Sequence, residues 1–344
     1  MESKHRGRQT MVFPTQPSIA SFASVAGKKE GQGPLASYFD LVENDTKFGQ
    51  KSWEKAESQM QILALEAALK KKDWQTKDLD VIFAGDLLNQ CVGSSFSLRA
   101  SGIPFYGLYG ACSTMAESLS LAAVMVDGGY ARRAAAMTSS HFASAERQYR
   151  TPLVYGGQRT PTAQWTVTGA GCILVQPEGE GPYVQAATTG IIADYGIKDA
   201  NNMGAAMAPA AYETIRAHLQ DLNLEASDYD LIVTGDLGVL GKEIVADLFL
   251  KDGAPLGNIY YDCGTMIYDI EEQDVHSGGS GCGCSASVLC GYLLKNMQQG
   301  KWERILFCGT GALLSPVSTQ QGESIPTVCH AVTISRKREV VWSI

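Results

Sequence analysis

The amino-acid sequence predicts an α/β protein assembled from two similar halves. Asp78–Asp86 (DLDVIFAGD) recurs in the second half as Asp228–Asp236 (DYDLIVTGD), and an amphipathic segment precedes each copy. Further along, Ala111–Ala116 matches Cys282–Ser287, and each of these stretches is later followed by an apolar, strand-like segment. Because both copies show the same order of strand and helix patterns, we expect a duplicated domain with two mixed sheets that share a buried helical layer.

The composition is typical of a compact soluble protein with a large core. The chain has 344 residues, of which 45% are hydrophobic and 19% charged. A net charge of −8 without a strongly basic segment argues against nucleic-acid binding. The apolar run Leu119–Val126 is far shorter than the roughly 18 residues that a transmembrane helix needs, and the N-terminus lacks the apolar core of a signal peptide. We therefore expect a cytoplasmic protein.

The nine cysteines are scattered along the chain and form no CxxC pair. Cys282 and Cys284 are separated by one residue, which is not a usual zinc spacing. Free thiols in a reducing compartment are therefore expected, and the sequence predicts neither a metal site nor a cofactor.

The first half is expected to alternate strands and helices. A strand-like stretch lies near Thr10–Phe13 in an otherwise polar N-terminal region. Ser52–Lys72 carries apolar residues at helical spacing, and Leu79–Ala84 is a short apolar run typical of a buried strand. A second helix is expected around Ser97–Ala100.

Ile103–Gly128 is the stretch around which the rest is organised. It predicts a strand, a sharp turn and a buried helix, with Cys112 at the bend. The first N–H groups of that helix have no partner within the helix, so they favour a thiolate or a bound carboxylate in front of them. The alternative is a small buried cysteine that only packs.

The following segments complete the expected pattern. Ala131–Met137 predicts a strand that ends in TSSH, and residues 142–164 predict a long, functional loop. Trp165–Val175 predicts a single strand with a glycine kink. In the second half we expect a helix over Ala211–Leu222 and a strand over Leu231–Thr234, with the small residues of MGAAMAPAA serving close packing.

Several separate segments of the chain resemble one family. The segments AGDLLNQ, GLYGACSTMAESL, WTVTGAG, GGSGCGCSA and TGALLSP together resemble the stage V sporulation protein AD family, thiolase-fold proteins of spore-forming bacteria. The resemblance extends over about residues 8–338. It implies a duplicated thiolase-like fold, five-layered αβαβα with two mixed sheets, divided into an N-terminal half (1–178) that carries Cys112 and a C-terminal half (179–344).

The resemblance also implies a function. Members of this family bind dipicolinic acid and its calcium chelate, and they act with membrane-embedded channel proteins in loading the compound into the developing spore and in its release at germination. The protein would then lie on the cytoplasmic side of the inner forespore membrane through its partners. Thiolase-fold proteins commonly form homodimers along the strand that corresponds here to Ile103–Gly110.

The residues expected for thioester chemistry are only partly present. Claisen-type catalysis needs a thiolate and a base, usually His or Asn. Cys112 fits the nucleophile, but Asp236 stands where condensing enzymes have His or Asn, and a glycine-rich stretch precedes the second elbow. His276 lies near that stretch, but the sequence favours a position in a surface loop for this residue. The sequence thus favours a non-catalytic binding protein; a β-ketoacyl synthase III-like enzyme using Cys112 and a purely structural subunit are the alternatives.

Dipicolinate is a planar ring with two carboxylates, so its site needs N–H and hydroxyl donors and a flat wall. Asp86 is expected to bind calcium if the ligand is the chelate, although a structural turn aspartate is the alternative. Ser139 and Ser140 have loop capping as their alternative role, and Arg147 and Arg150 are expected either to complement carboxylates or to be solvated. The expected ligand-binding residues are Asp86, Cys112, Ser139, Ser140, His141, Thr168 and Gly169.

Overall fold

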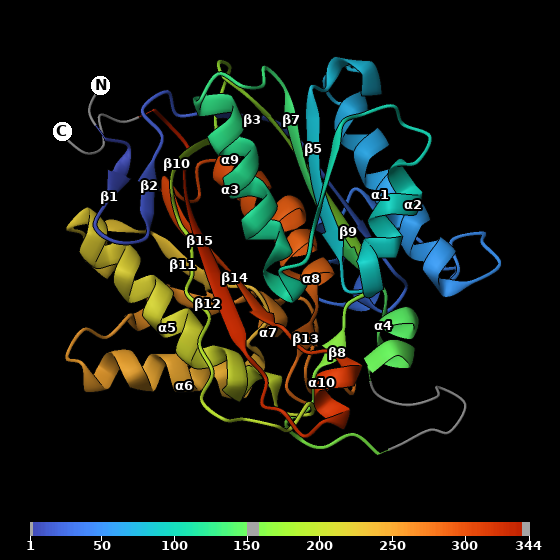
Figure 1. The fold of residues 1–344 in the computed structure, drawn as a ribbon, viewed down its shortest axis with the longest axis vertical. Helices are drawn as coiled ribbons and strands as arrows, with labels where there is room; N and C mark the ends of the chain where they lie inside the picture. The colour runs from blue at the N-terminus through green and yellow to red at the C-terminus, as the bar shows by residue number, and fades with distance from the viewer. Residues whose placement is uncertain (1–2, 150–157, 339–344) are drawn as a thin grey trace.

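The computed structural model describes residues 3–149 and 158–338 and contains a mixed sheet in each half (Figure 1). In the first half β5 is parallel to β6 and β7, whereas β9 is antiparallel to β7 and β3. The strand order across this sheet is β6-β5-β7-β9-β3. These strands are β3 (Ser18–Ala26), β5 (Val81–Asp86), β6 (Phe105–Leu108), β7 (Ala134–Ser140) and β9 (Gly169–Gln176).

The sheet of the second half repeats this arrangement strand for strand. Its order is β12-β11-β14-β15-β10, with β11 parallel to β12 and β14, and β15 antiparallel to β14 and β10. One residue pair, Tyr183 with Ser18, links the two sheets. The predicted fold class is therefore confirmed. The strands are β10 (Tyr183–Thr188), β11 (Leu231–Thr234), β12 (Tyr260–Asp262), β14 (Arg304–Ala312) and β15 (Thr327–Ser335).

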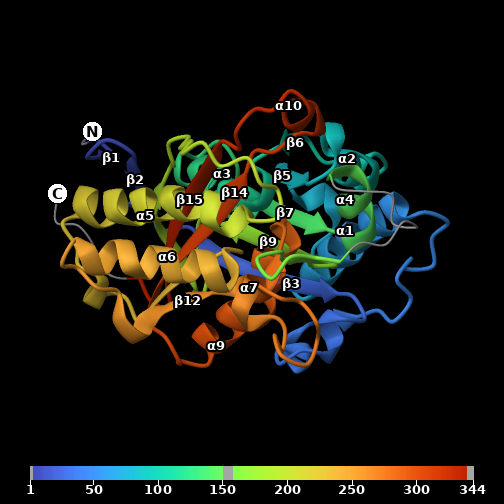
Figure 2. The same cartoon turned by 90° about the horizontal axis from the view of Figure 1, so that it is seen from below.

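Helices lie on the outside of both sheets and between them (Figures 1 and 2). The outer helices are α1 (Trp53–Lys70) and α2 (Val92–Leu98) on the first sheet, and α5 (Met203–Leu222) and α6 (Gly238–Lys251) on the second. The central layer consists of α3 (Thr114–Asp127), α8 (Cys282–Val288) and α9 (Leu294–Gln298). One core cluster combines buried side chains of both halves, so the division at residue 178 stays a prediction.

None of the helices in the described part of the chain has the length and apolarity that a membrane crossing demands.

Short elements complete the fold. The short elements are β1 (His5–Arg6), β2 (Thr10–Val12), β4 (Leu41–Val42), β8 (Trp165–Thr166), β13 (Gly279–Ser280), α4 (Phe142–Tyr149), α7 (Cys263–Met266) and α10 (Pro316–Gln320).

Three expectations from the sequence were wrong. The N-terminal region contains a long strand, β3, whose serines and most of whose alanines are buried and give no clear apolar signal. The single strand expected over Trp165–Val175 is broken after Thr166, because β8 pairs with β13 instead of continuing along the sheet. The expected loop over 142–164 begins with helix α4, and its residues 150–157 lie outside the described residues.

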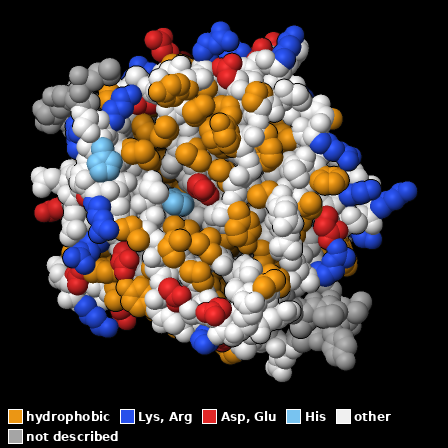
Figure 3. Space-filling model, in the orientation of Figure 1, with side chains coloured by type: hydrophobic (Ala, Val, Ile, Leu, Met, Phe, Trp, Pro, Cys, Tyr) orange, Lys and Arg blue, Asp and Glu red, His pale blue; other side chains and the backbone are white. Residues whose placement is uncertain are grey.

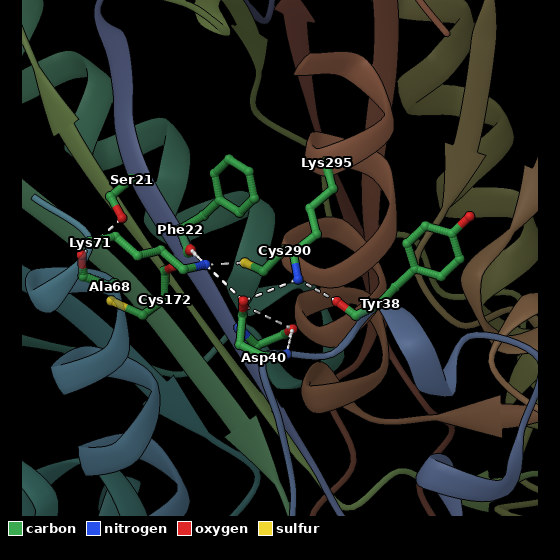
Figure 4. Close-up of polar contacts among 10 residues, drawn as sticks. Ser21, Phe22, Tyr38, Asp40, Ala68, Lys71, Cys172, Cys290 and Lys295 are labelled. Atoms are coloured by element: carbon green, nitrogen blue, oxygen red, sulfur yellow. Dashed lines mark hydrogen bonds and ion pairs between the residues drawn. The ribbon is translucent and has the colours of Figure 1, made fainter. Parts of the chain in front are cut away.

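An ion-pair cluster fastens the segment after β3 to both halves of the molecule (Figure 4). Asp40 Oδ1 lies 2.8 Å from Lys71 Nζ, just after α1, and 3.0 Å from Lys295 Nζ on α9. The two ammonium groups also donate to the carbonyl oxygens of Phe22 and Tyr38. Burial acts to raise the pKa of Asp40, but its hydrogen bonds, that from Lys71 foremost, lower it overall, so Asp40 is a charged link between halves.

Candidate functional site

Cys112 lies at a tight elbow between β6 and α3, as the sequence predicts. Ala111, directly before it, has φ = 48°, a left-handed conformation that a residue with a Cβ adopts at a cost. The elbow packs against β14 at a glycine, because a Cβ on Gly311 would lie 2.3 Å from the carbonyl oxygen of Gly110. The glycines of the Cys308–Gly311 stretch therefore allow close packing behind the cysteine.

The Cys112 side chain lines a small, mainly apolar cavity. The cavity volume is about 40 Å³, room for roughly three water molecules. The hydroxyl groups of Tyr109 and Tyr149 form a hydrogen bond of 2.9 Å with each other at this cavity. Its walls are formed by Leu87, Tyr109, Ala111, Cys112, Ala145, Tyr149, Thr166, Met203, Ser280, Gly281, Ala312 and Leu314.

The carboxyl group of Asp236, which follows β11, lies beside the Cys112 thiol and interacts with it electrostatically. Its oxygens also accept hydrogen bonds from Thr310 Oγ1 at 2.7 Å and from the Gly281 N–H at 2.8 Å. Burial raises the pKa of Asp236 to about 6, so the carboxyl group is mainly ionised at neutral pH. Burial and then the charge of Asp236 raise the pKa of Cys112 well above its usual value, so the thiol stays protonated.

None of the five histidines, all of which lie in the described part of the chain, lines the Cys112 cavity. His276 binds the carbonyl oxygen of Thr160 and the carboxylate of Asp274 in a partly exposed loop. The expectation that His276 occupies a surface loop is therefore in accord with the structure, and the imidazole of a condensing enzyme has no counterpart at Cys112.

Asp86 does not line the Cys112 cavity. Its Oδ1 accepts from the Leu88 N–H at 2.9 Å, and its Oδ2 accepts from both the N–H and the hydroxyl of Ser94, each at 2.7 Å. The carboxyl group is fully buried and connects β5 to α2, which is the structural alternative considered for it. Within the described ranges, no group of three or more His, Cys, Asp or Glu side chains is placed to hold a metal ion.

Ser139, Ser140 and Gly169 belong to the buried packing between β7, β9 and α8. Ser139 Oγ accepts from Gln61 and donates to the buried carboxyl of Glu57. Ser140 Oγ donates to the Val167 carbonyl oxygen and accepts from the N–H of Gly283, and a Cβ on Gly169 would meet α8. None of the three lines the Cys112 cavity.

His141 and Thr168 line a different and larger cleft beside Trp53 and Trp165. The His141 ring is fully engaged, since Nδ1 accepts from the Ala143 N–H and Nε2 donates to the Thr46 carbonyl oxygen at 2.7 Å. Burial lowers the pKa of His141, so the ring is neutral at pH 7.

The seven expected residues are thus divided between the Cys112 cavity, this cleft and the core. Arg147 pairs with Glu54 on α1, whereas Arg150 lies outside the described residues. Two features of the site were not predicted. The contact between Asp236 and Cys112 joins residues from different halves, and the tryptophans of the cleft carry no motif that marks them. The only signal for Asp236 was its position where condensing enzymes have His or Asn.

The duplicated sheets with a cysteine at the first elbow define a thiolase-like, synthase-type fold. The structure is similar to a 3-oxoacyl-[acyl-carrier-protein] synthase III from Aquifex aeolicus (TM-score 0.58, 13% identity, 93% of this chain and 99% of that chain). It is also similar to the cerulenin-bound OleA of Xanthomonas campestris (TM-score 0.59, 14% identity, 94% and 98%). At these identities the likeness shows the fold alone.

The sequence comparisons show the family. The profile of stage V sporulation protein AD matches residues 7–335. The stage V sporulation protein AD of Bacillus subtilis (strain 168) is 46% identical over 333 residues, which are 97% of this chain and 98% of that protein. The chain therefore belongs to the stage V sporulation protein AD family, a family of sporulation proteins, and the resemblance seen in its motifs is confirmed.

Proposed function

We propose that the protein is a non-catalytic binding protein for dipicolinic acid or its calcium chelate. The observation that carries this proposal is the buried contact between the Cys112 thiol and the Asp236 carboxylate. A condensing enzyme stabilises an enolate opposite its cysteine, and a carboxylate at that place would repel the enolate. A protonated thiol is also a poor nucleophile. The scaffold is thus better suited to holding a ligand than to transforming a thioester.

Calorimetric titration of the full chain with dipicolinate, with and without calcium, tests this proposal. We expect saturable heat and an increase in the melting temperature, because a ligand that binds only the folded state stabilises it. No heat and no thermal shift at millimolar dipicolinate, in either condition, would rule the proposal out. The acyl-thioester alternative instead requires a Cys112 adduct after incubation with acyl-coenzyme A, which intact-mass spectrometry detects.

Partnership with membrane-embedded channel proteins is part of the same proposal. The family membership supports a role in sporulation, and the resemblance implies that these partners bring the protein to the inner forespore membrane. Retention by vesicles that carry the channel proteins, and not by bare vesicles, is the corresponding test.

We also propose a homodimer along β6. This strand ends the first sheet, and the side chains of Phe105, Tyr106 and Tyr109 on or beside it are exposed. Figure 3 shows apolar side chains gathered over α3 on the same view as Figure 1. An exposed, apolar sheet edge is an unstable surface for a monomer, and pairing with a second copy would cover it.

Replacing Tyr106 by glutamate should convert the dimer to a monomer, because a charge would be buried at the paired edge. Tyr261 on β12 is the matched control: it pairs with Val233 as Tyr106 pairs with Phe83, and it is similarly exposed at the outer edge of the second sheet. Sedimentation velocity should show a monomer for Tyr106→Glu and a dimer for Tyr261→Glu. A monomeric wild-type protein, or a dimer in both variants, would contradict this arrangement.

A further inference from the structure

A groove lies on the outer helical layer of the second half, between the C-terminal ends of α5 and α6. The two helices pack side by side on the outside of the second sheet (Figures 1 and 2), and the groove has a volume of about 580 Å³. Its apolar lining includes Leu219, Leu224 and Phe249, of which the two leucines are only partly buried. The groove therefore presents apolar surface that the fold leaves open to a partner.

The segment that forms this outer layer carries most of the net negative charge of the chain. From the start of α5 to the C-cap of α6, residues 203–252 contain nine acidic and three basic residues, whereas the net charge of the whole chain is −8. The corresponding part of the first half, residues 53–99, contains seven acidic and six basic residues. Because the two halves share one fold, the acidic excess is not a requirement of that fold.

Two carboxylates border the groove, those of Glu225 and Asp252, and Arg216 is the basic side chain of its lining. Neither carboxylate forms an ion pair with any residue in the described ranges 3–149 and 158–338. Asp252 accepts a hydrogen bond from the Tyr212 hydroxyl, which Arg216 contacts at 3.5 Å. The C-terminal ends of both helices add partial negative charge, so the rim favours a cation.

The equivalent place in the first half has a different character. By the alignment of the two repeats, Gln75 corresponds to Glu225 and Trp74 to Leu224. Gln75 and Glu225 begin the same kind of turn, since each donates its backbone N–H to an aspartate three residues later at 2.8 Å. Arg133 Cζ lies 4.2 Å from the ring centroid of Trp74, so a cation already covers the aromatic side chain there. The open leucine beside an acid distinguishes the second half.

We propose that this groove binds a basic amphipathic segment of a partner protein. Apolar side chains of the segment would contact Leu219 and Leu224, and its lysine or arginine side chains would pair with Glu225 and Asp252. Recognition of an amphipathic helix in a groove has this division between an apolar floor and a charged rim. Nucleic acids and anionic lipids would be repelled by the same charge. The inference goes beyond the proposed function, because it does not depend on dipicolinate.

Fluorescence anisotropy of a labelled peptide, titrated with the full chain, tests the groove. The probe is an amphipathic leucine–lysine peptide of about four helical turns. Glu225→Gln and Asp252→Asn should each weaken binding about threefold, and together about tenfold, because each removes one exposed ion pair. Asp73→Asn is the matched control: Asp73 is exposed after α1, in the left-handed conformation that Asn223 has after α5, and the dissociation constant should not change.

The peptide chemistry is tested separately. A lysine–serine peptide of the same charge should bind more weakly, since it has no apolar side chains for the floor of the groove; equal affinity would contradict the role of that floor. Absence of binding of the leucine–lysine peptide to the wild type at millimolar concentration would overturn the proposal. Binding that both groove variants retain in full would do the same, because the peptide would then lie elsewhere on the acidic surface.

A second copy of the chain is the competing occupant of the groove. Sedimentation velocity of the combined Glu225→Gln and Asp252→Asn variant should show the same assembly as the wild type. A smaller assembly would assign the groove to another copy and overturn the proposal. Glu225→Gln introduces the side chain that the first half has in the same turn, at Gln75, so this variant keeps the test valid even if Asp252→Asn disturbs folding.

Discussion

Replacing Asp236 by asparagine should make Cys112 react at least about ten times faster with a small alkylating agent at pH 8, which corresponds to a decrease of about one unit in the thiol pKa. In the wild type, burial and the neighbouring carboxylate both raise that pKa. Asparagine removes only the charge: its side-chain oxygen can accept from the Gly281 N–H, and its amide group can donate to the Thr310 hydroxyl.

Peptide mass spectrometry after timed alkylation measures this effect at Cys112 itself. The buried cysteines Cys91, Cys172 and Cys290 serve as internal references, because the charge of Asp236 does not contribute to the raised pKa of any of them. A Cys112→Ser variant identifies the labelled peptide. If the alkylation rate of Cys112 is the same with and without the Asp236 charge, burial alone controls the thiol, and the carboxylate is not what suppresses its reactivity.

Replacing Glu57 by glutamine should remove part of the loss of stability at alkaline pH. Glu57 on α1 is fully buried and accepts hydrogen bonds from Ser139 and Ser144. Burial, followed by the nearby charge of Asp86, raises the pKa of Glu57 well above its usual value. The folded state therefore holds this proton more tightly than the unfolded state does.

The direction of this pH effect on stability follows from the linkage between proton binding and folding. Stability from this proton is fully present below the pKa of Glu57 in the unfolded chain and is lost as the pH rises through its pKa in the folded state. In that window the wild type should lose up to about 1.4 kcal/mol per pH unit more than Glu57→Gln does. Glutamine keeps both serine contacts, since its amide can donate to Ser144 and its oxygen can accept from Ser139.

Urea unfolding of both proteins between pH 5 and 9 measures the difference in slope. Glu66→Gln is the control, because Glu66 is exposed on the same helix and its loss should leave the slope unchanged. Parallel curves for wild type and Glu57→Gln would show that Glu57 is ionised in the folded protein, contrary to this account.

Both predictions concern carboxyl groups that pair with a neutral partner in the interior. Asp236 faces a thiol, and Glu57 faces two hydroxyls, so neither has a cation beside it. Asp236 lies at the position where condensing enzymes carry out proton transfer. Glu57 contacts Ser139 at the strand end that the sequence indicated as a ligand site, and this contact shows that polar residues there serve folding.

The repeat and the elbow could be read from the sequence alone. The two copies of the DxDxIxxGD pattern predicted two mixed sheets built from elements in the same order along the chain, because a local pattern of apolar and turn residues determines each strand and its end. The absence of His or Asn at position 236 was likewise visible, since residue identity needs no coordinates. Strand β3 was missed because most of its residues are small serines and alanines, which are buried by the tertiary structure and not by their own hydrophobicity.

Only the tertiary structure decided which strand-end residues face a cavity. Asp86 and Asp236 occupy equivalent positions in the repeat, yet one caps α2 and the other contacts Cys112. Trp53 and Trp165 are far apart in the chain and line one cleft. The physical reason is that a side chain's orientation at a strand end depends on its hydrogen-bond partners from distant segments, and those partners are brought together by folding.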